Sequence, residues 1–201
     1  MAARIVVLVS GTGSNLAALI DAADSGRLDA EVVAVVSDRP GVLALERAEA
    51  AGIPTQVVSP GDYDDRGAWD EALAEVLTAF SPNLVVSAGF MRLLGPRVLG
   101  ACPVVNTHPA LLPAFPGTHA VADALAYGVT VTGCTVHWVD DGVDTGPILA
   151  QAPVAVKADD TEAELHERIK TVERLLLVEV VGRLVSEGWT LDGRKTRFGS
   201  E

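Results

Sequence analysis

Short runs of β-branched residues alternate with longer segments rich in Ala and Leu through the first half of the chain, and this alternation constrains the fold more than any other feature. The runs have the length and composition of strands that are buried on both faces, whereas the longer segments suit helices. Because a helix between two strands carries the chain back to the same edge of the sheet, consecutive strands pair in parallel. The predicted strands lie at residues 4–9, 31–37, 54–58 and 83–87, and the predicted helices lie at residues 15–24, 42–51 and 67–80. We therefore expect an α/β fold with a mostly parallel twisted sheet that is flanked by helices.

The pattern changes in the second half of the chain. A fifth strand at residues 104–106 leads into an irregular stretch that is rich in Pro and Gly. Residues 130–140 and 147–156 then alternate between apolar and polar side chains, which predicts an antiparallel hairpin. A long last helix is predicted over residues 161–187, because Thr161 suits the N-cap and glutamates follow it in the first turn. The tail after this helix is predicted to add a short edge hairpin and then to fray.

Composition and charge exclude several classes of protein. Hydrophobic residues make up 49% of the 201 residues, which is too many for a disordered chain and enough for a substantial core. A formal net charge of −12 argues against a surface that binds nucleic acid or an anionic membrane. The apolar runs are far shorter than the roughly 18 residues of a membrane span, and the N-terminus lacks the apolar stretch of a signal peptide. Cys102 and Cys134 lack the spacing of a zinc site, so we expect a reduced, cytoplasmic protein.

The glycines that follow the first predicted strand form a candidate anion site. Gly11 and Gly13 permit a close backbone approach, and the N-terminus of the next helix offers N–H groups and the positive end of its dipole. The dinucleotide fingerprint fails because Leu16 replaces its third glycine, and the lysine of a Walker motif is absent. A phosphate group is therefore the predicted ligand, and a tight turn without a ligand is the alternative.

Arg66 is a candidate to complete this phosphate site. It lies where the loop after the third predicted strand meets the third predicted helix. In a parallel sheet this loop opens at the same edge as the glycines. The alternative is a solvated arginine that pairs with Asp64 or Asp65.

Asn106, His108 and Asp144 form a candidate catalytic group. The first two lie two residues apart at the end of a central strand, where α/β proteins bind ligands, and Gly-rich turns can bring Asp144 toward His108. An amide donor for an oxyanion, a cationic or proton-transferring imidazole and a carboxylate suit acyl transfer without a covalent nucleophile. The alternatives are a structural histidine and a turn-forming aspartate. His119 and His137 are assigned to structural roles. The HExxH motif of a zinc site and the GxSxG motif of a serine hydrolase are absent, so we expect neither a metal centre nor a serine nucleophile.

Four ordered motifs give the chain a resemblance to the phosphoribosylglycinamide formyltransferases, a folate-dependent family of purine synthesis. These motifs are VVLVSGTGSNLAALIDA, VSAGFMRLLGP, VVNTHPALLPAFPGTHA and GCTVHWVDDGVDTGPILAQ, and the similarity covers nearly the whole length. The resemblance implies the formyltransferase variant of the Rossmann-like fold. It also implies transfer of a formyl group from 10-formyltetrahydrofolate to the amine of 5-phosphoribosylglycinamide (GAR), two small-molecule substrates, without a metal.

The resemblance assigns roles to three groups of residues. The catalytic positions are Asn106, His108 and Asp144. The GAR-binding positions are Gly11, Thr12, Gly13, Ser14, Asn15, Arg66, Pro109 and Glu173. The folate-binding positions are Met91, Arg92, Leu93, Leu94, Val139, Asp140 and Asp141. Because no repeat or linker interrupts the sequence, we expect one domain over residues 1–201, with a ribonucleotide-binding half at 1–100 and a catalytic and folate-binding half at 101–201.

Three residues depart from the family pattern: Thr12 stands where Asn is frequent, Ala114 where Lys is frequent and Thr145 where Gly is frequent. None of these changes removes a catalytic group. Formyltetrahydrofolate hydrolase, or another folate-dependent formyltransferase, is one alternative, although the hydrolase lacks the glycine motif and methionyl-tRNA formyltransferase carries an additional nucleic-acid-binding domain. A non-catalytic nucleotide-binding regulatory module, in which Asp38 binds a ribose hydroxyl, is another. Both a monomer and a homodimer remain open.

Overall fold

The computed structural model describes residues 2–199, which form two compact units that divide after Asn106. In chain order the first unit contains β1 (Ala3–Val9), α1 (Ser14–Asp24), β2 (Ala30–Ser37), α2 (Leu43–Ala50), β3 (Thr55–Val57), the short 3-10 helix η1 (Pro60–Asp62), α3 (Arg66–Ala79), β4 (Leu84–Ser87), α4 (Pro96–Ala101) and most of β5 (Val104–His108). The second unit continues with α5 (Ala120–Tyr127), β6 (Val131–Trp138), β7 (Ile148–Ala155), α6 (Glu162–Ser186), β8 (Trp189–Asp192) and β9 (Lys195–Phe198).

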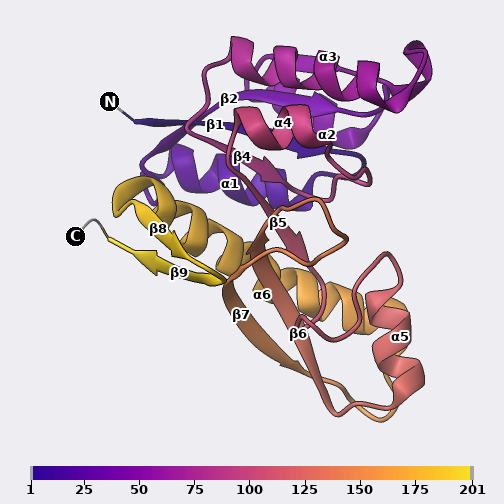
Figure 1. Ribbon diagram of the computed structural model, residues 1–201. Helices are drawn as coiled ribbons and strands as arrows, with labels where there is room; N and C mark the ends of the chain where they lie inside the picture. Colours follow the sequence, from indigo (N-terminus) through magenta and orange to yellow (C-terminus); the bar gives the residue numbers. More distant parts are fainter. Residues whose placement is uncertain (1, 200–201) are drawn as a thin grey trace. The chain divides into compact units, whose positions relative to one another are not determined.

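Five parallel strands form the sheet of the first unit, in the order β3-β2-β1-β4-β5. Residues 5–9 of β1 and all of β4 are buried, as continuous apolar runs predict for strands that are covered on both faces. Helices α1 and α2 contact each other, as do α3 and α4. Figure 1 shows α1 and α3 on opposite sides of β1 and β2. The structure thus confirms the parallel sheet with flanking helices.

The order of the strands reverses at β1. The chain moves outward from β1 to β3, then crosses back and enters the sheet as β4 on the other side of β1. Such a reversal is where open α/β sheets bind ligands, outside the carboxyl ends of their strands. A hydrogen bond from Met91 N to Ser10 Oγ, 2.9 Å long, ties the loop after β4 to the loop after β1 at this edge.

An antiparallel hairpin and a long helix form most of the second unit. β6 and β7 pair as predicted, and α6 packs against both strands. Thr161 begins α6 with a reciprocal capping box, in which its hydroxyl oxygen accepts from Glu164 N while the Glu164 carboxylate accepts from Thr161 N. The buried core beside this helix contains Val121, Cys134, Val154, Leu165 and Ile169.

The tail forms its predicted hairpin, but this hairpin makes a separate two-stranded sheet instead of extending an edge of the larger one. The rings of Trp138 and Trp189 lie 4.4 Å apart between centroids, and the Arg183 guanidinium lies 3.8 Å from the centre of the Phe198 ring. These contacts attach β8 and β9 to β6 and α6. The predicted fraying concerns residues 200–201, which lie outside the described residues.

The sequence did not predict bounds for α4 and α5, although His119, which was expected to fit a helix N-cap, is the N-cap of α5. α4 has only six residues, too few to show a helical repeat. In α5 nearly every side chain is apolar or small, so the sequence shows little contrast between a buried and an exposed face. Within residues 2–199, no helix has the combination of length and apolar character that crossing a membrane requires.

The start of α1 generates a stability prediction. Gly13 has φ of +71°, and a Cβ at this position would lie 2.7 Å from the Cβ of Ala44. We expect Gly13→Ala to lower the free energy of unfolding by about 2–5 kcal/mol, because left-handed backbone strain adds to overpacking. Gly11→Ala is the matched control, since a Cβ at Gly11 meets no atom within 4 Å. Urea denaturation measures both variants, and equal stabilities would contradict the packing argument.

Candidate active site

His108 and Asp144 lie together in the second unit, as the sequence predicted. His108 is the last residue of β5 and is only 4% exposed. Its Nδ1 is 3.3 Å from Asp144 Oδ2, which also accepts a 2.7 Å hydrogen bond from Gly117 N. Asp144 has φ of +53°, a left-handed conformation that a short polar residue tolerates and that directs its carboxylate to these donors. Half-buried Asn106 precedes His108 by two residues on β5, so both side chains leave the same face of the strand.

A second histidine, His137, belongs to this cluster. The sequence predicted a structural role for His137, because this residue lies inside an alternating strand. In the structure it is buried near the end of β6, with Nε2 3.6 Å from Asp144 Oδ1 and Nδ1 2.8 Å from the Trp138 carbonyl. Its place in the strand that leads directly into the Asp144 loop was the signal that could have identified it.

The two ring nitrogens of His108 face oxygens that only accept hydrogen bonds. Nε2 lies 2.7 Å from the Phe115 carbonyl, while Nδ1 faces the Asp144 carboxylate. Only an imidazolium donates to both, so these acceptors favour the charged ring. Burial acts in the opposite direction and lowers the pKa of His108, although the Asp144 charge and the Phe115 carbonyl oppose this shift. The pKa of His108 therefore lies below its usual value, and the ring gains a second hydrogen bond when it takes up a proton.

Asp144 remains ionised beside these histidines. Burial raises its pKa, but hydrogen bonds from His137 and Gly117 N, together with the charge of His108, outweigh burial and hold the pKa below its usual value. In this arrangement the imidazole can receive a proton, and the neighbouring carboxylate stabilises the resulting cation.

The glycine loop, residues 11–15 of the first unit, is held from outside by α2. Ala44 N donates to the Gly11 carbonyl over 3.1 Å, and Arg47 Nε donates to the Thr12 carbonyl over 3.0 Å. Within residues 2–199, no side chain caps the N-terminus of α1. Asn15 is 7% exposed, and its Oδ1 has no hydrogen-bond partner among the described residues. The loop is thus fixed in shape while the N–H groups that begin α1 lack a side-chain cap, which suits an anion site.

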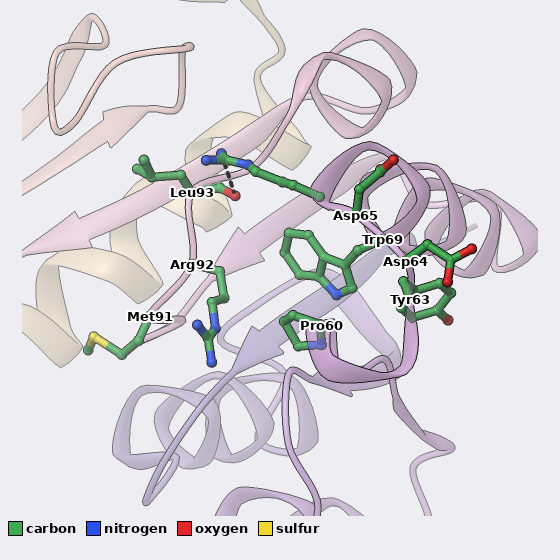
Figure 2. Close-up of a pocket in the computed structure, with 9 residues that line it drawn as sticks. Pro60, Tyr63, Asp64, Asp65, Trp69, Met91, Arg92 and Leu93 are labelled. Carbon is green, nitrogen blue, oxygen red and sulfur yellow. Dashed lines mark hydrogen bonds between the residues drawn. The ribbon is translucent and has the colours of Figure 1, made fainter.

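Arg66 lies in a cavity of about 540 Å³ whose lining is entirely in the first unit. Figure 2 shows Met91, Arg92 and Leu93 along one side of this cavity and Trp69 on the other. Arg66 is the first residue of α3, and its Nη2 donates to the Leu93 carbonyl over 3.3 Å. The structure therefore brings Arg66, predicted for the phosphate site, to the segment predicted for folate.

The remaining residues that were predicted to bind folate are divided between the two units. Leu94 is buried and directly follows residues 91–93, which line the cavity. Val139, Asp140 and Asp141 begin the loop that carries Asp144. Asp140 Oδ1 accepts from Thr145 Oγ1 over 2.6 Å and from Gly142 N over 3.2 Å, which stiffens that loop.

Pro109 and Glu173 lie in the second unit. Pro109 follows His108 directly and is half-buried. Glu173 is buried on α6. The burial of Cys134 and the negative charge of Glu173 together raise the pKa of Cys134 to about 12. Cys134 is therefore a neutral thiol that serves the core, not a nucleophile. The described residues contain no group of three or more His, Cys, Asp or Glu that could hold a metal ion.

Asp38, the residue that the regulatory-module alternative assigns to a ribose hydroxyl, has other partners. Its carboxylate forms ion pairs with Arg39 and Arg92. Both pairs involve Oδ2, and Arg39 Nε also donates to Oδ1 over 3.2 Å, so the structure does not favour a ribose contact at this position.

Comparisons with known proteins show which family this chain is similar to. The family model described as formyl transferase matches residues 3–181. Phosphoribosylglycinamide formyltransferase of Mycobacterium tuberculosis (strain ATCC 25618 / H37Rv) is 57% identical over 199 residues, which cover 98% of this chain and 92% of that protein. The trifunctional purine biosynthetic protein adenosine-3 of Bos taurus is 47% identical over 98% of this chain and 20% of its own length. The crystal structure of glycinamide ribonucleotide transformylase 1 from Symbiobacterium toebii matches with a TM-score of 0.96 and 44% identity, over 98% of this chain and 94% of that one. The predicted formyltransferase fold is thereby confirmed.

The opposing effects on His108 generate a prediction. Since the Asp144 charge raises the pKa of His108, Asp144→Asn removes that support, and we expect the pKa of His108 to fall further. NMR titration of the imidazole resonances measures the change. Asp160→Asn is the control, because Asp160 pairs with Arg168 and does not contact His108. An unchanged or raised pKa of His108 in Asp144→Asn would show that the carboxylate does not act on this ring.

Proposed function

The chain belongs to the formyl transferase family, and we propose that it transfers the formyl group of 10-formyltetrahydrofolate to the amine of GAR, giving formyl-GAR and tetrahydrofolate in purine biosynthesis. The observation that carries this proposal is the buried His108, which lies 3.3 Å from Asp144 and two residues after Asn106 on the same strand. Relatives named phosphoribosylglycinamide formyltransferase support the choice of acceptor.

The two substrates are assigned to different segments. The glycine loop holds the phosphate of GAR through the N–H groups at the start of α1, and Pro109 and Glu173 contact the rest of GAR, as the family resemblance implies. Residues 91–94 and 139–141 bind folate. Met91 and Leu93 have exposed side chains beside the cavity, and exposed apolar side chains suit a flat aromatic ligand. Because Arg66 bonds to Leu93, we assign Arg66 to the folate side.

The reaction forms a bond between the amine nitrogen of GAR and the formyl carbon, and it breaks the bond between that carbon and the folate nitrogen. Asn106 donates its amide N–H to the oxyanion of the tetrahedral intermediate. His108 takes the proton that the attacking amine loses, and its second hydrogen bond then forms. The Asp144 carboxylate stabilises this imidazolium, which returns the proton to the departing folate nitrogen, so atoms and charge balance. No step requires a metal or a covalent nucleophile.

Hydrolysis of 10-formyltetrahydrofolate is the second candidate, because the same three side chains would activate a water. The glycine loop favours transfer, since hydrolysis has no use for a phosphate site. We also propose that the protein works in the cytoplasm on these small molecules, without nucleic acid or membrane.

The proposed reaction is tested by following folate release with and without GAR. We expect turnover that depends on GAR and that His108→Ala lowers about 10²- to 10⁴-fold, since the variant removes the general base. The variant also shows that the activity comes from this site. Equal folate release in the absence of GAR would identify a hydrolase and contradict the proposal.

The phosphate assignment is tested by Gly11→Val. A side chain at Gly11 enters open space, so the fold should persist, but it blocks the approach of a phosphate to the loop. Loss of a hydrogen bond to a charged group costs roughly 1.5–3 kcal/mol, so KM for GAR should rise about 10- to 150-fold. The internal control is KM for 10-formyltetrahydrofolate, which should not change. An unchanged KM for GAR in Gly11→Val would contradict the assignment of the phosphate to this loop.

A further inference from the structure

The segment between β4 and α4, residues 88–95, has no regular secondary structure, yet side chains from four other places hold it. Three of its consecutive side chains are exposed, with Met91 62% and Leu93 46% accessible. A segment of this kind is ordinarily mobile, because few buried contacts oppose its conformational entropy. What holds its backbone therefore decides whether a ligand meets a preformed surface.

Two of the anchors hold backbone N–H groups. Met91 N donates to Ser10 Oγ over 2.9 Å at the start of the exposed stretch. At its end, Gly95 N and Arg97 N donate to the two carboxylate oxygens of Asp70, over 2.7 and 2.8 Å. These bonds fix where the segment enters and leaves.

The exposed stretch between these ends has two further anchors, and they differ in strength. Arg66 is exposed, and its bond to the Leu93 carbonyl is 3.3 Å long. Arg92 Nε, by contrast, lies 2.7 Å from Asp38 Oδ2, and the Asp38 side chain has no exposed surface. A short, charge-assisted bond to a buried acceptor is the stronger restraint.

Asp38 is placed for this task. It follows β2 directly and is 2% exposed, a position that is unfavourable for a carboxylate unless cations pair with it. Arg39 supplies part of that pairing, with Nη2 3.0 Å from Oδ2 and Nε 3.2 Å from Oδ1. Because Arg39 neutralises the carboxylate from its own loop, the bond to Arg92 is available to hold a different loop. Burial raises the pKa of Asp38, but its hydrogen bonds to Arg39, Ser10 and Arg92 outweigh burial and keep the group ionised.

We propose that Asp38 is a positioning residue for the folate substrate, which holds the peptide groups of residues 91–94 in a preformed arrangement through Arg92. This inference rests on the proposed function, which assigns that segment to folate. Asp38 itself does not touch substrate. Its loss should therefore weaken folate binding while the chemical step and the phosphate site remain intact.

The test is Asp38→Asn, which keeps the shape of the side chain and removes its charge. We expect KM for 10-formyltetrahydrofolate to rise about 10-fold or more, in line with the loss of a charge-assisted bond, with kcat and KM for GAR changed less than about twofold. Arg39→Gln is the matched control, because it removes the other arginine that pairs with Asp38 without altering residues 88–95. It should raise the folate KM much less.

A double-mutant cycle separates positioning from general damage. If Asp38 acts through Arg92, Asp38→Asn should add nothing to the folate KM of Arg92→Gln, whereas independent effects would add. Should Asp38→Asn fail to fold, Arg92→Lys keeps the charge and loses the Nε contact, and it should raise the folate KM by itself. A folate KM that is unchanged in the folded variant, or equal increases in both KM values, would overturn the positioning role.

The outcomes also separate this inference from the proposed function. Failure of the unaltered protein to formylate GAR would reject the proposed function. In that case calorimetric titration with tetrahydrofolate still compares the unaltered protein with Asp38→Asn, and equal affinities would reject the positioning role. Normal turnover by the unaltered protein with an unchanged folate KM in Asp38→Asn would reject the positioning role alone.

Discussion

The reversal of strand order at β1 is the constraint on which the rest of the first unit depends. Because each crossover helix packs against the sheet, the return from β3 to β4 places helices on both faces and leaves the loops after β1 and β4 at one edge. The hydrogen bond between Ser10 and Met91 joins those two loops directly. The order of the strands therefore determines where the glycine loop and residues 88–95 lie. Local hydrogen bonds then fix the conformation of each loop.

Strand-forming runs and the cap of α6 could be predicted because their signals are local. Continuous β-branched runs give buried parallel strands, and Thr161 with Glu164 gives a helix start. The pairing of His108 with Asp144 was also within reach, since strand ends and Gly-rich loops meet at ligand sites.

The features that were missed depend on contacts between distant parts of the sequence. His137 joins the Asp144 cluster through the fold of its hairpin, and the Arg92 partner of Asp38 comes from a loop 54 residues further along the chain. A sequence shows which residue carries a charge, but packing decides which neighbour it finds. The pKa of His108 depends on the same kind of contact: the sequence showed a carboxylate that favours the cation, but it did not show the depth of burial that opposes it.

Asp38 and Asp144 are both ionised carboxylates close to the end of a strand, and the chemistry of their partners separates their roles. Arg39 and Arg92 pair with Asp38 through guanidinium groups, which do not exchange protons in proteins, so this attraction can only hold structure. His108 gains and loses a proton, so its attraction to Asp144 strengthens when the ring becomes charged. The same buried carboxylate thus acts as a fixed anchor when it faces a guanidinium and as a support for proton transfer when it faces an imidazole. This difference explains why Asp38→Asn should change how folate is held, whereas Asp144→Asn should change when His108 carries its proton.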